Sequence, residues 1–197
     1  GLGSSSSFCV GLVKGLSILR GKKLNIEENA KIAFNIEKYK VKNYCGKQDH
    51  YIAAYGGLKY FEFCKNEKVK VKNLNRLSPN LKKITNNMLS FYTFRQRESK
   101  KILKHQTEKV KDLTNLYISM NKLTENGLRI IKKKNFNSKD FCNVIHKSWE
   151  LKKTFSPMIS SKKIDTLYSK CINLGAYGGK ISGAGGGGFL NIFGPNN

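Results

Sequence analysis

The sequence predicts an α+β protein with two domains, on the strength of three observations. Apolar residues recur at helical spacing in segments spread over the whole 197-residue chain. Apolar and polar residues alternate, as in half-buried strands, in segments that lie mostly before Arg95. After Arg95 a long polar segment with a helical pattern begins. We therefore place the domain change near residues 95–97 and expect domains over 1–95 and 96–197.

The first domain is expected to start with a loop, Gly1–Ser7, that leads into a helix ending near Arg20–Gly21. A second helix is predicted over residues 29–40. Three strands then follow, and we expect them to form one sheet with the helices covering one face. These strands are predicted over residues 55–64, 68–74 and 87–94. The apolar stripe of the first helix consists of Phe8, Leu12, Val13, Leu16 and Leu19.

The second domain is predicted to be mainly helical, with a strand pair at its end. Residues 99–134 carry apolar side chains at spacings of three and four, which indicates one or two amphipathic helices. Two more helical patterns cover residues 140–151 and 162–174, and Gly175 closes the second. The tail over 180–193 is predicted as strand, glycine loop and strand.

The composition allows a folded core and excludes several classes of protein. With 39% hydrophobic and 25% charged residues, the chain can build one sizeable core or two small ones, and collagen, coiled coil and wholesale disorder are excluded. No apolar run approaches the roughly 18 residues of a membrane-spanning helix, and the start of the chain carries no export pattern. We therefore expect a soluble, cytoplasmic protein that does not bind membranes.

The charge admits two interpretations. The chain carries 37 Lys and Arg against 13 Asp and Glu, a formal charge of +24, which is typical of a nucleic-acid-binding module. However, the cations are mostly lysine and are spread from Lys14 to Lys180. Nucleic-acid recognition favours forked arginine side chains on one face, so a solvated surface is the preferred interpretation and no nucleic-acid partner is expected.

The cysteines and histidines predict neither a disulfide framework nor a metal site. They show no CxxC motif and no spacing typical of zinc ligands, so buried or incidental thiols are the preferred interpretation. These residues are Cys9, Cys45, Cys64, Cys142 and Cys171, with His50, His105 and His146.

The segment Gly1–Ser7 suits a phosphate group. Small residues before a helix leave the backbone N–H groups and the positive end of the helix dipole open to an anion, and serine hydroxyls add donors or a ligand for Mg²⁺. The spacing matches neither a P-loop nor a dinucleotide fold. A plain helix cap or a flexible linker is the alternative.

Gly183–Gly188 places consecutive glycines between apolar residues. Because glycine has no side chain, this run indicates a backbone that approaches another group closely, with a tight hairpin turn as the alternative.

Asp49 lies between Gln48 and His50 in a chain poor in acidic residues. It is a candidate catalytic carboxylate, and the alternative is a helix cap for residues 51–55.

Taken together, the motifs resemble the GHMP family of small-molecule kinases, and most of all its D-glycero-D-manno-heptose 7-phosphate kinases. The matching segments are GLGSSSSFCVGL, Glu37 followed by YCGKQDHYIAAYGGLKYFEF, LKKTFSP with KID, and GGKISGAGGGGFLNIF. The resemblance covers essentially the whole chain. It implies a two-domain GHMP kinase architecture, with an incomplete N-terminal part like domain 2 of ribosomal protein S5 and a ferredoxin-like C-terminal α+β domain.

The resemblance also implies roles for the matched residues. Asp49 would take the proton from the sugar hydroxyl or orient that hydroxyl, and Ser5 and Glu37 would hold Mg²⁺. Residues that would bind ATP lie in two groups. These are Gly1, Leu2, Gly3, Ser4, Ser5, Ser6 and Ser7 in the first loop, and Gly183, Ala184, Gly185 and Gly186 in the glycine-rich third motif.

The implied activity is an ATP- and Mg²⁺-dependent phosphorylation of the anomeric hydroxyl of D-glycero-D-manno-heptose 7-phosphate, which gives the 1,7-bisphosphate. The implied partners are ATP and a sugar phosphate. A family member acting on another sugar, of the fucose or galactose type, remains an alternative, with a basic nucleic-acid-binding module as a more remote one. An inactive kinase-like interaction protein is disfavoured because Glu37 and Asp49 are both present.

The sequence departs from the family pattern in two places. His50 stands where the similar heptose kinases more often have Gln. The chain also opens within the second family motif, so the first motif and much of the adenine pocket are expected upstream of Gly1. We therefore expect this piece alone to bind ATP poorly and to turn over little or nothing.

Overall fold

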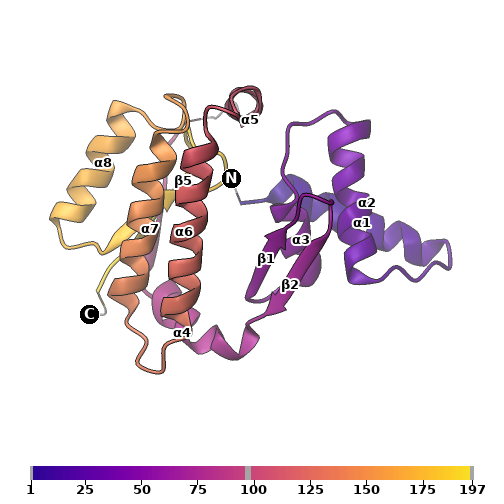
Figure 1. The fold of residues 1–197 in the computed structure, drawn as a ribbon, viewed down its shortest axis with the longest axis horizontal. Helices are drawn as coiled ribbons and strands as arrows, with labels where there is room; N and C mark the ends of the chain where they lie inside the picture. The colour runs from indigo at the N-terminus through magenta and orange to yellow at the C-terminus, as the bar shows by residue number, and fades with distance from the viewer. Residues whose placement is uncertain (1, 96–98, 196–197) are drawn as a thin grey trace. The chain divides into compact units, whose positions relative to one another are not determined.

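The computed structural model describes residues 2–95 and 99–195, which divide into two compact units. The N-terminal unit is Leu2–Ser78 and the C-terminal unit is Pro79–Asn197. Both combine helices with antiparallel strands, so the predicted α+β class is confirmed (Figure 1). The domain change expected near residues 95–97 falls inside the C-terminal unit, where Arg95 is described and residues 96 and 97 lie outside the described residues.

The N-terminal unit contains three α-helices and a strand hairpin. An isolated strand pair is marginal in water, and here α2 and α3 supply the apolar surface that it needs. Buried Ala30, Tyr51 and Val69 form the centre of this core. The elements are α1 (Ser4–Leu19), α2 (Ile26–Asn35), the π-helical turn η1 (Ile36–Lys40), α3 (Gln48–Tyr55), β1 (Lys59–Phe63), β2 (Val69–Asn73) and the 3₁₀ turn η2 (Asn75–Leu77).

Local sequence explains where these helices begin and end. Asn25 and Glu28 form a reciprocal capping box at the start of α2, with each side chain accepting a backbone N–H of the other residue. Helix α1 ends at Leu19, before Gly21, whose φ of +67° a residue with a side chain rarely adopts. The predicted end of the first helix is therefore confirmed.

The apolar stripe of α1 is mostly exposed. Phe8 is 72% exposed and Leu19 is 83% exposed, while Ser6 and Val10 on another face are buried. Helix α1 packs on α2 and α3 through that second face, which carries small and short side chains. The apolar stripe of this helix is therefore not the face that is buried in the described part of the chain.

The C-terminal unit places helices on an antiparallel sheet of strand order β3-β5-β4. Helices α6 and α7 lie side by side, and α7 also packs on β4 (Figure 1). Fully buried Trp149, Ile159, Ile181 and Leu190 lie in its main core. The elements are α4 (Ser78–Thr85), β3 (Met88–Tyr92), α5 (Ser99–Glu108), α6 (Thr114–Ile131), α7 (Ser138–Lys153), α8 (Lys162–Asn173), β4 (Gly178–Ile181) and β5 (Phe189–Phe193).

The prediction of one sheet from the first three strands is wrong. Among the residues that the structure describes, strands β1 and β2 pair only with each other, with Phe61 opposite Val71. Strand β3 instead pairs with β5, where the Ser90 hydroxyl donates a hydrogen bond to Asn191 Oδ1 at 2.6 Å. This pairing ties residues 88–92 to the end of the chain, which is why the compact units divide before β3 and not after it.

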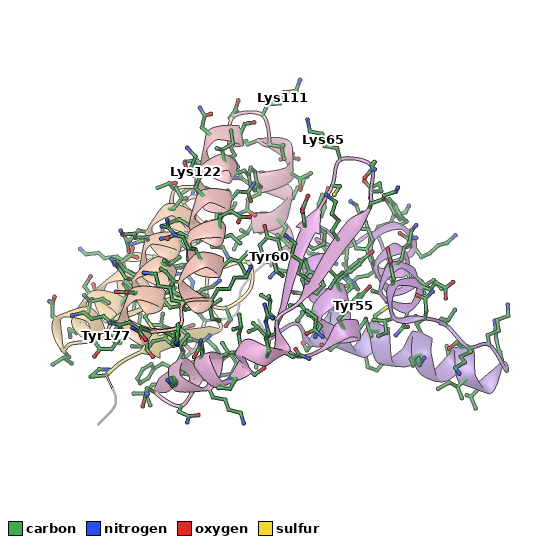
Figure 2. The ribbon with its side chains drawn as sticks, turned by 60° about the horizontal axis from the view of Figure 1, so that its bottom comes forward. Tyr55, Tyr60, Lys65, Lys111, Lys122 and Tyr177 are labelled. Atoms are coloured by element: carbon green, nitrogen blue, oxygen red, sulfur yellow. The ribbon has the colours of Figure 1, made fainter. Side chains whose placement is uncertain are left out.

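Many lysine side chains lie on the solvated surface, whereas Lys180 in β4 is half-buried, and this burial lowers the pKa of its ammonium group. Lys65 in the β1–β2 turn, Lys111 before α6 and Lys122 on α6 are exposed and project outward (Figure 2). Within the described ranges, no helix has both the length and the apolar character that crossing a membrane requires.

Candidate active site

The serine-rich segment forms the first turn of α1 rather than a loop. Gly3 caps the helix with a φ of +67°, and its carbonyl oxygen accepts the backbone N–H of Ser7 at 2.9 Å. Ser4 is the first helical residue. Gly1, predicted to belong to the same site, lies outside the described residues. The serine hydroxyls and the unpaired N–H groups of a helix N-terminus thus occupy one place, which is an arrangement suited to an anion.

Glu37 is held by side chains from three other segments. It lies in the π-helical turn η1 and is only 8% exposed. One carboxylate oxygen, Oε1, accepts the Ser5 hydroxyl at 2.5 Å and the Asn43 amide at 3.5 Å. The other, Oε2, accepts the Ser6 hydroxyl at 3.2 Å and lies 2.7 Å from His50 Nε2. Since an ionised carboxylate only accepts, Nε2 carries the proton of this bond.

These partners keep Glu37 ionised. Burial is the largest single influence and raises the pKa of the carboxyl group, because a charge is less stable away from water. The hydrogen bond from Ser5 and the interactions with His50 and Ser6 outweigh it, so the pKa of Glu37 lies below its ordinary value. At neutral pH the group is therefore an anion whose oxygens can accept hydrogen bonds or bind a cation.

Cys45 and His50 lie beside Glu37. One ligand atom from each of the three residues falls within 4.8 Å of the other two. The π-helical turn and the loop after it bring these three residues together although they share no familiar motif, and the absence of a metal site among the cysteines and histidines stays a prediction. Burial, followed by the charge of Glu37, raises the pKa of the Cys45 thiol to about 11.

Asp49 is placed at the serine turn. It lies in the first turn of α3, where Lys47 and not Asp49 is the N-cap residue, so the helix-cap alternative is wrong. Its carboxylate is exposed and lies beside Gly3, since a Cβ atom added to that glycine would be 3.8 Å from Asp49 Cγ and Oδ2. The next residue, His50, points inward and is fully buried. The start of α3 therefore directs a carboxylate to the surface and an imidazole to Glu37.

The predicted site residues fall in two places. Leu2–Ser7, Glu37 and Asp49 gather in the N-terminal unit, while Gly183–Gly186 belong to the C-terminal unit. Sequence reasoning missed Asn43 and Cys45, and it treated His50 only as a departure from a pattern. The sequence feature that could have indicated these residues is that they follow Glu37 within 14 positions, although other polar residues do so as well.

The glycine-rich tail is the connection between β4 and β5, as the hairpin alternative supposed. The close approach inferred from the sequence is also present, and its partner within the described residues is the protein itself. The Gly186 N–H donates to the Ile159 carbonyl oxygen at 2.7 Å, and a Cβ atom on Gly185 would come within 2.8 Å of Ile159 Cγ2. Lys152 Nζ donates to the Gly183 carbonyl oxygen.

Alanine at Gly185 is expected to destabilise the C-terminal unit far more than alanine at Gly188. Both residues have positive φ, +104° and +89°, but only Gly185 also lacks room for a Cβ atom. We expect losses of about 3–5 kcal/mol for Gly185→Ala and about 1–2 kcal/mol for Gly188→Ala. Urea unfolding followed by the fluorescence of Trp149, the single tryptophan, measures both. Equal losses would show that crowding by Ile159 plays no part.

Comparisons with known proteins agree with this architecture. The model of the GHMP kinase N-terminal domain matches residues 1–57, and the model of the GHMP kinase C-terminal region matches residues 131–196. The chain is 32% identical to the D-glycero-alpha-D-manno-heptose 7-phosphate kinase of Campylobacter jejuni subsp. jejuni serotype O:2 over 202 residues. That match covers 98% of this chain and 57% of the relative.

Solved structures share the fold. Methanococcus jannaschii mevalonate kinase superposes with a TM-score of 0.73 at 26% identity, over 98% of this chain and 56% of that one. A D-glycero-D-manno-heptose 1-phosphate kinase from Bacteroides thetaiotaomicron superposes with a TM-score of 0.62 at 24% identity, over 98% and 53%. This chain thus spans little more than half the length of these relatives.

The predicted architecture is confirmed by these matches. The two GHMP models together cover more than half of the chain and occur in the order that the sequence motifs indicated. Because both models describe parts of one kind of kinase, the chain belongs to the GHMP kinase family.

Proposed function

We propose that this chain forms part of an ATP- and Mg²⁺-dependent sugar kinase that acts in the cytoplasm. The observation that carries the proposal is the grouping of Ser5, Glu37 and Asp49 at the N-terminus of α1. Phosphoryl transfer needs positioned phosphates, neutralised charge and an in-line acceptor, and it asks little covalent chemistry of the protein. A helix N-terminus, an anionic oxygen ligand and an exposed carboxylate meet these needs.

The residues around Glu37 fit a magnesium ion. Mg²⁺ prefers oxygen ligands, and the buried Glu37 carboxylate lies against the hydroxyls of Ser5 and Ser6. Ser5 and Glu37 would hold the ion, which when bound neutralises phosphate charge. In the N-terminal unit, Gly1, Leu2, Gly3, Ser4, Ser6 and Ser7 would bind the phosphates of ATP. In the C-terminal unit, Gly183, Ala184, Gly185 and Gly186 are assigned to ATP binding from the glycine-rich motif alone.

Asp49 is assigned to the acceptor hydroxyl. The hydroxyl oxygen bonds to the γ-phosphorus as the bond from that phosphorus to the β,γ-bridging oxygen breaks, and ADP leaves. Asp49 accepts the proton of the hydroxyl or orients it. Its exposure beside Gly3 supports this role, because the carboxylate stays accessible next to the turn that would hold the phosphates.

The acceptor we favour is D-glycero-D-manno-heptose 7-phosphate, with phosphorylation of the anomeric hydroxyl to the 1,7-bisphosphate. The support is the 32% identity to a kinase named for that sugar phosphate. A GHMP kinase acting on a fucose- or galactose-type sugar is the alternative.

Steady-state assays of the whole protein decide between these acceptors. ADP release is measured with heptose 7-phosphate, fucose, galactose and mannose, each with and without Mg²⁺. We expect the highest kcat/KM with heptose 7-phosphate and no turnover after Mg²⁺ is removed by chelation. A higher kcat/KM with an unphosphorylated sugar would show that the acceptor is that sugar, and the proposed phosphoryl transfer would still hold. If no sugar stimulates ADP release, the kinase proposal is wrong.

A further inference from the structure

We propose that Glu37, Cys45 and His50 form a binding site for a borderline-soft divalent cation of the Zn²⁺ type. The three residues come from the π-helical turn η1, the loop that follows it and the first turn of α3. This inference does not depend on the proposed kinase activity, because it concerns binding to side chains within the N-terminal unit alone.

The chemistry of the three ligands selects the cation. Carboxylate, thiolate and imidazole are the groups that bind Zn²⁺ in proteins, whereas Mg²⁺ avoids sulfur and nitrogen. Glu37 would therefore serve two kinds of ion, with the Ser5 hydroxyl at Oε1 suited to a hard cation and His50 at Oε2, with Cys45 nearby, suited to a softer one.

The distances are close to those of a metal site. In a tetrahedral zinc site the distance from the metal to each ligand atom is about 2.0–2.3 Å. Neighbouring ligand atoms are then roughly 3.3–3.8 Å apart. The ligand atoms of Glu37, Cys45 and His50 already lie within 4.8 Å of one another. Side-chain adjustments of about 1 Å would close the site, and with three protein ligands a fourth position is left for water.

His50 is held at the cluster by its surroundings. The side chain is fully buried, its Nε2 atom lies 2.7 Å from Glu37 Oε2, and the ring meets Phe34 edge-on at 5.6 Å between centroids. Nε2 is therefore the nitrogen that would bind a cation shared with Glu37. The ring proton would then sit on Nδ1, which has no hydrogen-bond partner in the part of the chain that the structure describes.

Cys45 completes the set. It is a free thiol, half-buried, and makes no hydrogen bond within the described residues. Binding of a cation would release its proton and leave the thiolate as a ligand. The other cysteines of the N-terminal unit make contacts of their own, since Cys9 Sγ donates to the Ala33 carbonyl oxygen at 3.4 Å and Cys64 Sγ lies 3.8 Å from the Glu62 carbonyl oxygen.

The test is a titration of the whole protein, reduced and free of chelator, with Co²⁺ as a spectroscopic probe for Zn²⁺. We expect a sulfur-to-cobalt charge-transfer band in the near ultraviolet and displacement of Co²⁺ by Zn²⁺. Cys45→Ser should abolish the band, and His50→Gln should weaken Zn²⁺ binding by about 10–100-fold. Cys64→Ser, which alters a half-buried thiol of the same unit, is the matched control and should keep the band.

A second measurement needs no variant. Iodoacetamide labelling of the unaltered protein, read by mass spectrometry, should slow at Cys45 when Zn²⁺ is added and stay unchanged at Cys64. Absence of a charge-transfer band at stoichiometric Co²⁺, a band that survives in Cys45→Ser, or Zn²⁺-independent labelling of Cys45 would each overturn the proposal. These readouts involve no turnover, so failure of the kinase proposal and failure of this one are told apart.

Discussion

Replacing Asp49 by Asn in the whole protein is expected to lower kcat by about 10²–10⁴-fold and to leave ATP affinity almost unchanged. The amide has the same shape but cannot accept the proton of the acceptor hydroxyl. The carboxylate is exposed beside Gly3 and makes no hydrogen bond or ion pair within the described residues, so its removal should disturb the fold little. Steady-state kinetics and nucleotide titration measure the two quantities separately.

Asp140→Asn is the matched control for this variant. Asp140 is also an exposed aspartate in the first turn of a helix, so both changes remove one negative charge from a helix N-terminus, which costs about 0.3–1 kcal/mol of stability. Asp140→Asn should keep full turnover. If Asp49→Asn also keeps it, Asp49 has no part in the chemistry, whereas a loss of ATP affinity in Asp49→Asn would assign it to nucleotide binding.

Replacing Glu37 by Gln is expected to lower kcat/KM by about 10²–10³-fold and to weaken the dependence of turnover on Mg²⁺. The amide removes the anionic ligand, and its NH₂ group must face donors that now point at the carboxylate, namely Ser5, Ser6 and His50. The free energy of unfolding should therefore fall as well, by about 1–3 kcal/mol at pH 7. Kinetics at varied Mg²⁺ and denaturant unfolding measure these effects.

The pH dependence of the free energy of unfolding separates the effect of the negative charge of Glu37 from the effect of its side-chain shape. Because the pKa of folded Glu37 is lowered from 4.5, its contribution to stability is complete above that value and is lost as pH falls through the folded-state pKa. The stability difference between the unaltered protein and Glu37→Gln should therefore shrink in acid. Glu62→Gln is the control, since Glu62 pairs with Lys70 at the surface at 3.0 Å and solvent screens such exposed pairs. A constant difference down to pH 3 would show that the ionised state of Glu37 does not contribute to stability.

Much of the fold could be predicted because its signals are local. The helix that ends before Gly21, the strand pair at residues 59–73 and the helices α5 to α8 follow from spacing, caps and glycines within a few residues. Helix α4 is absent from the sequence prediction because the 75–85 segment is short and has no long apolar pattern, although Ser78–Pro79 is a helix-start signal. Motifs identify Asp49 and Glu37 as candidate site residues, but they do not predict how far these residues lie from the serine turn.

Strand pairing and burial faces depend on contacts between residues far apart in the chain. Strand β3 was correctly predicted as a strand but assigned to the wrong sheet, because nothing within residues 87–94 specifies a partner about 100 positions away. The stripe on α1 that begins at Phe8 has the pattern of a buried face, yet it is exposed in the described chain. Periodicity reports which side chains share a face, and packing decides which face is covered.

Residue patterns within short segments specify most of the local elements, the small residues near the start of the first helix and the acidic residues suited to phosphoryl transfer. The hydrogen bonds from Ser5, Ser6, Asn43 and His50 to Glu37, and the place of Cys45 beside them, are visible only in the folded chain. Hydrogen bonding and metal ligation require atoms within a few ångströms, and spacing along the chain does not specify such distances. That proximity is set here by a π-helical turn and a loop whose path no residue pattern specifies.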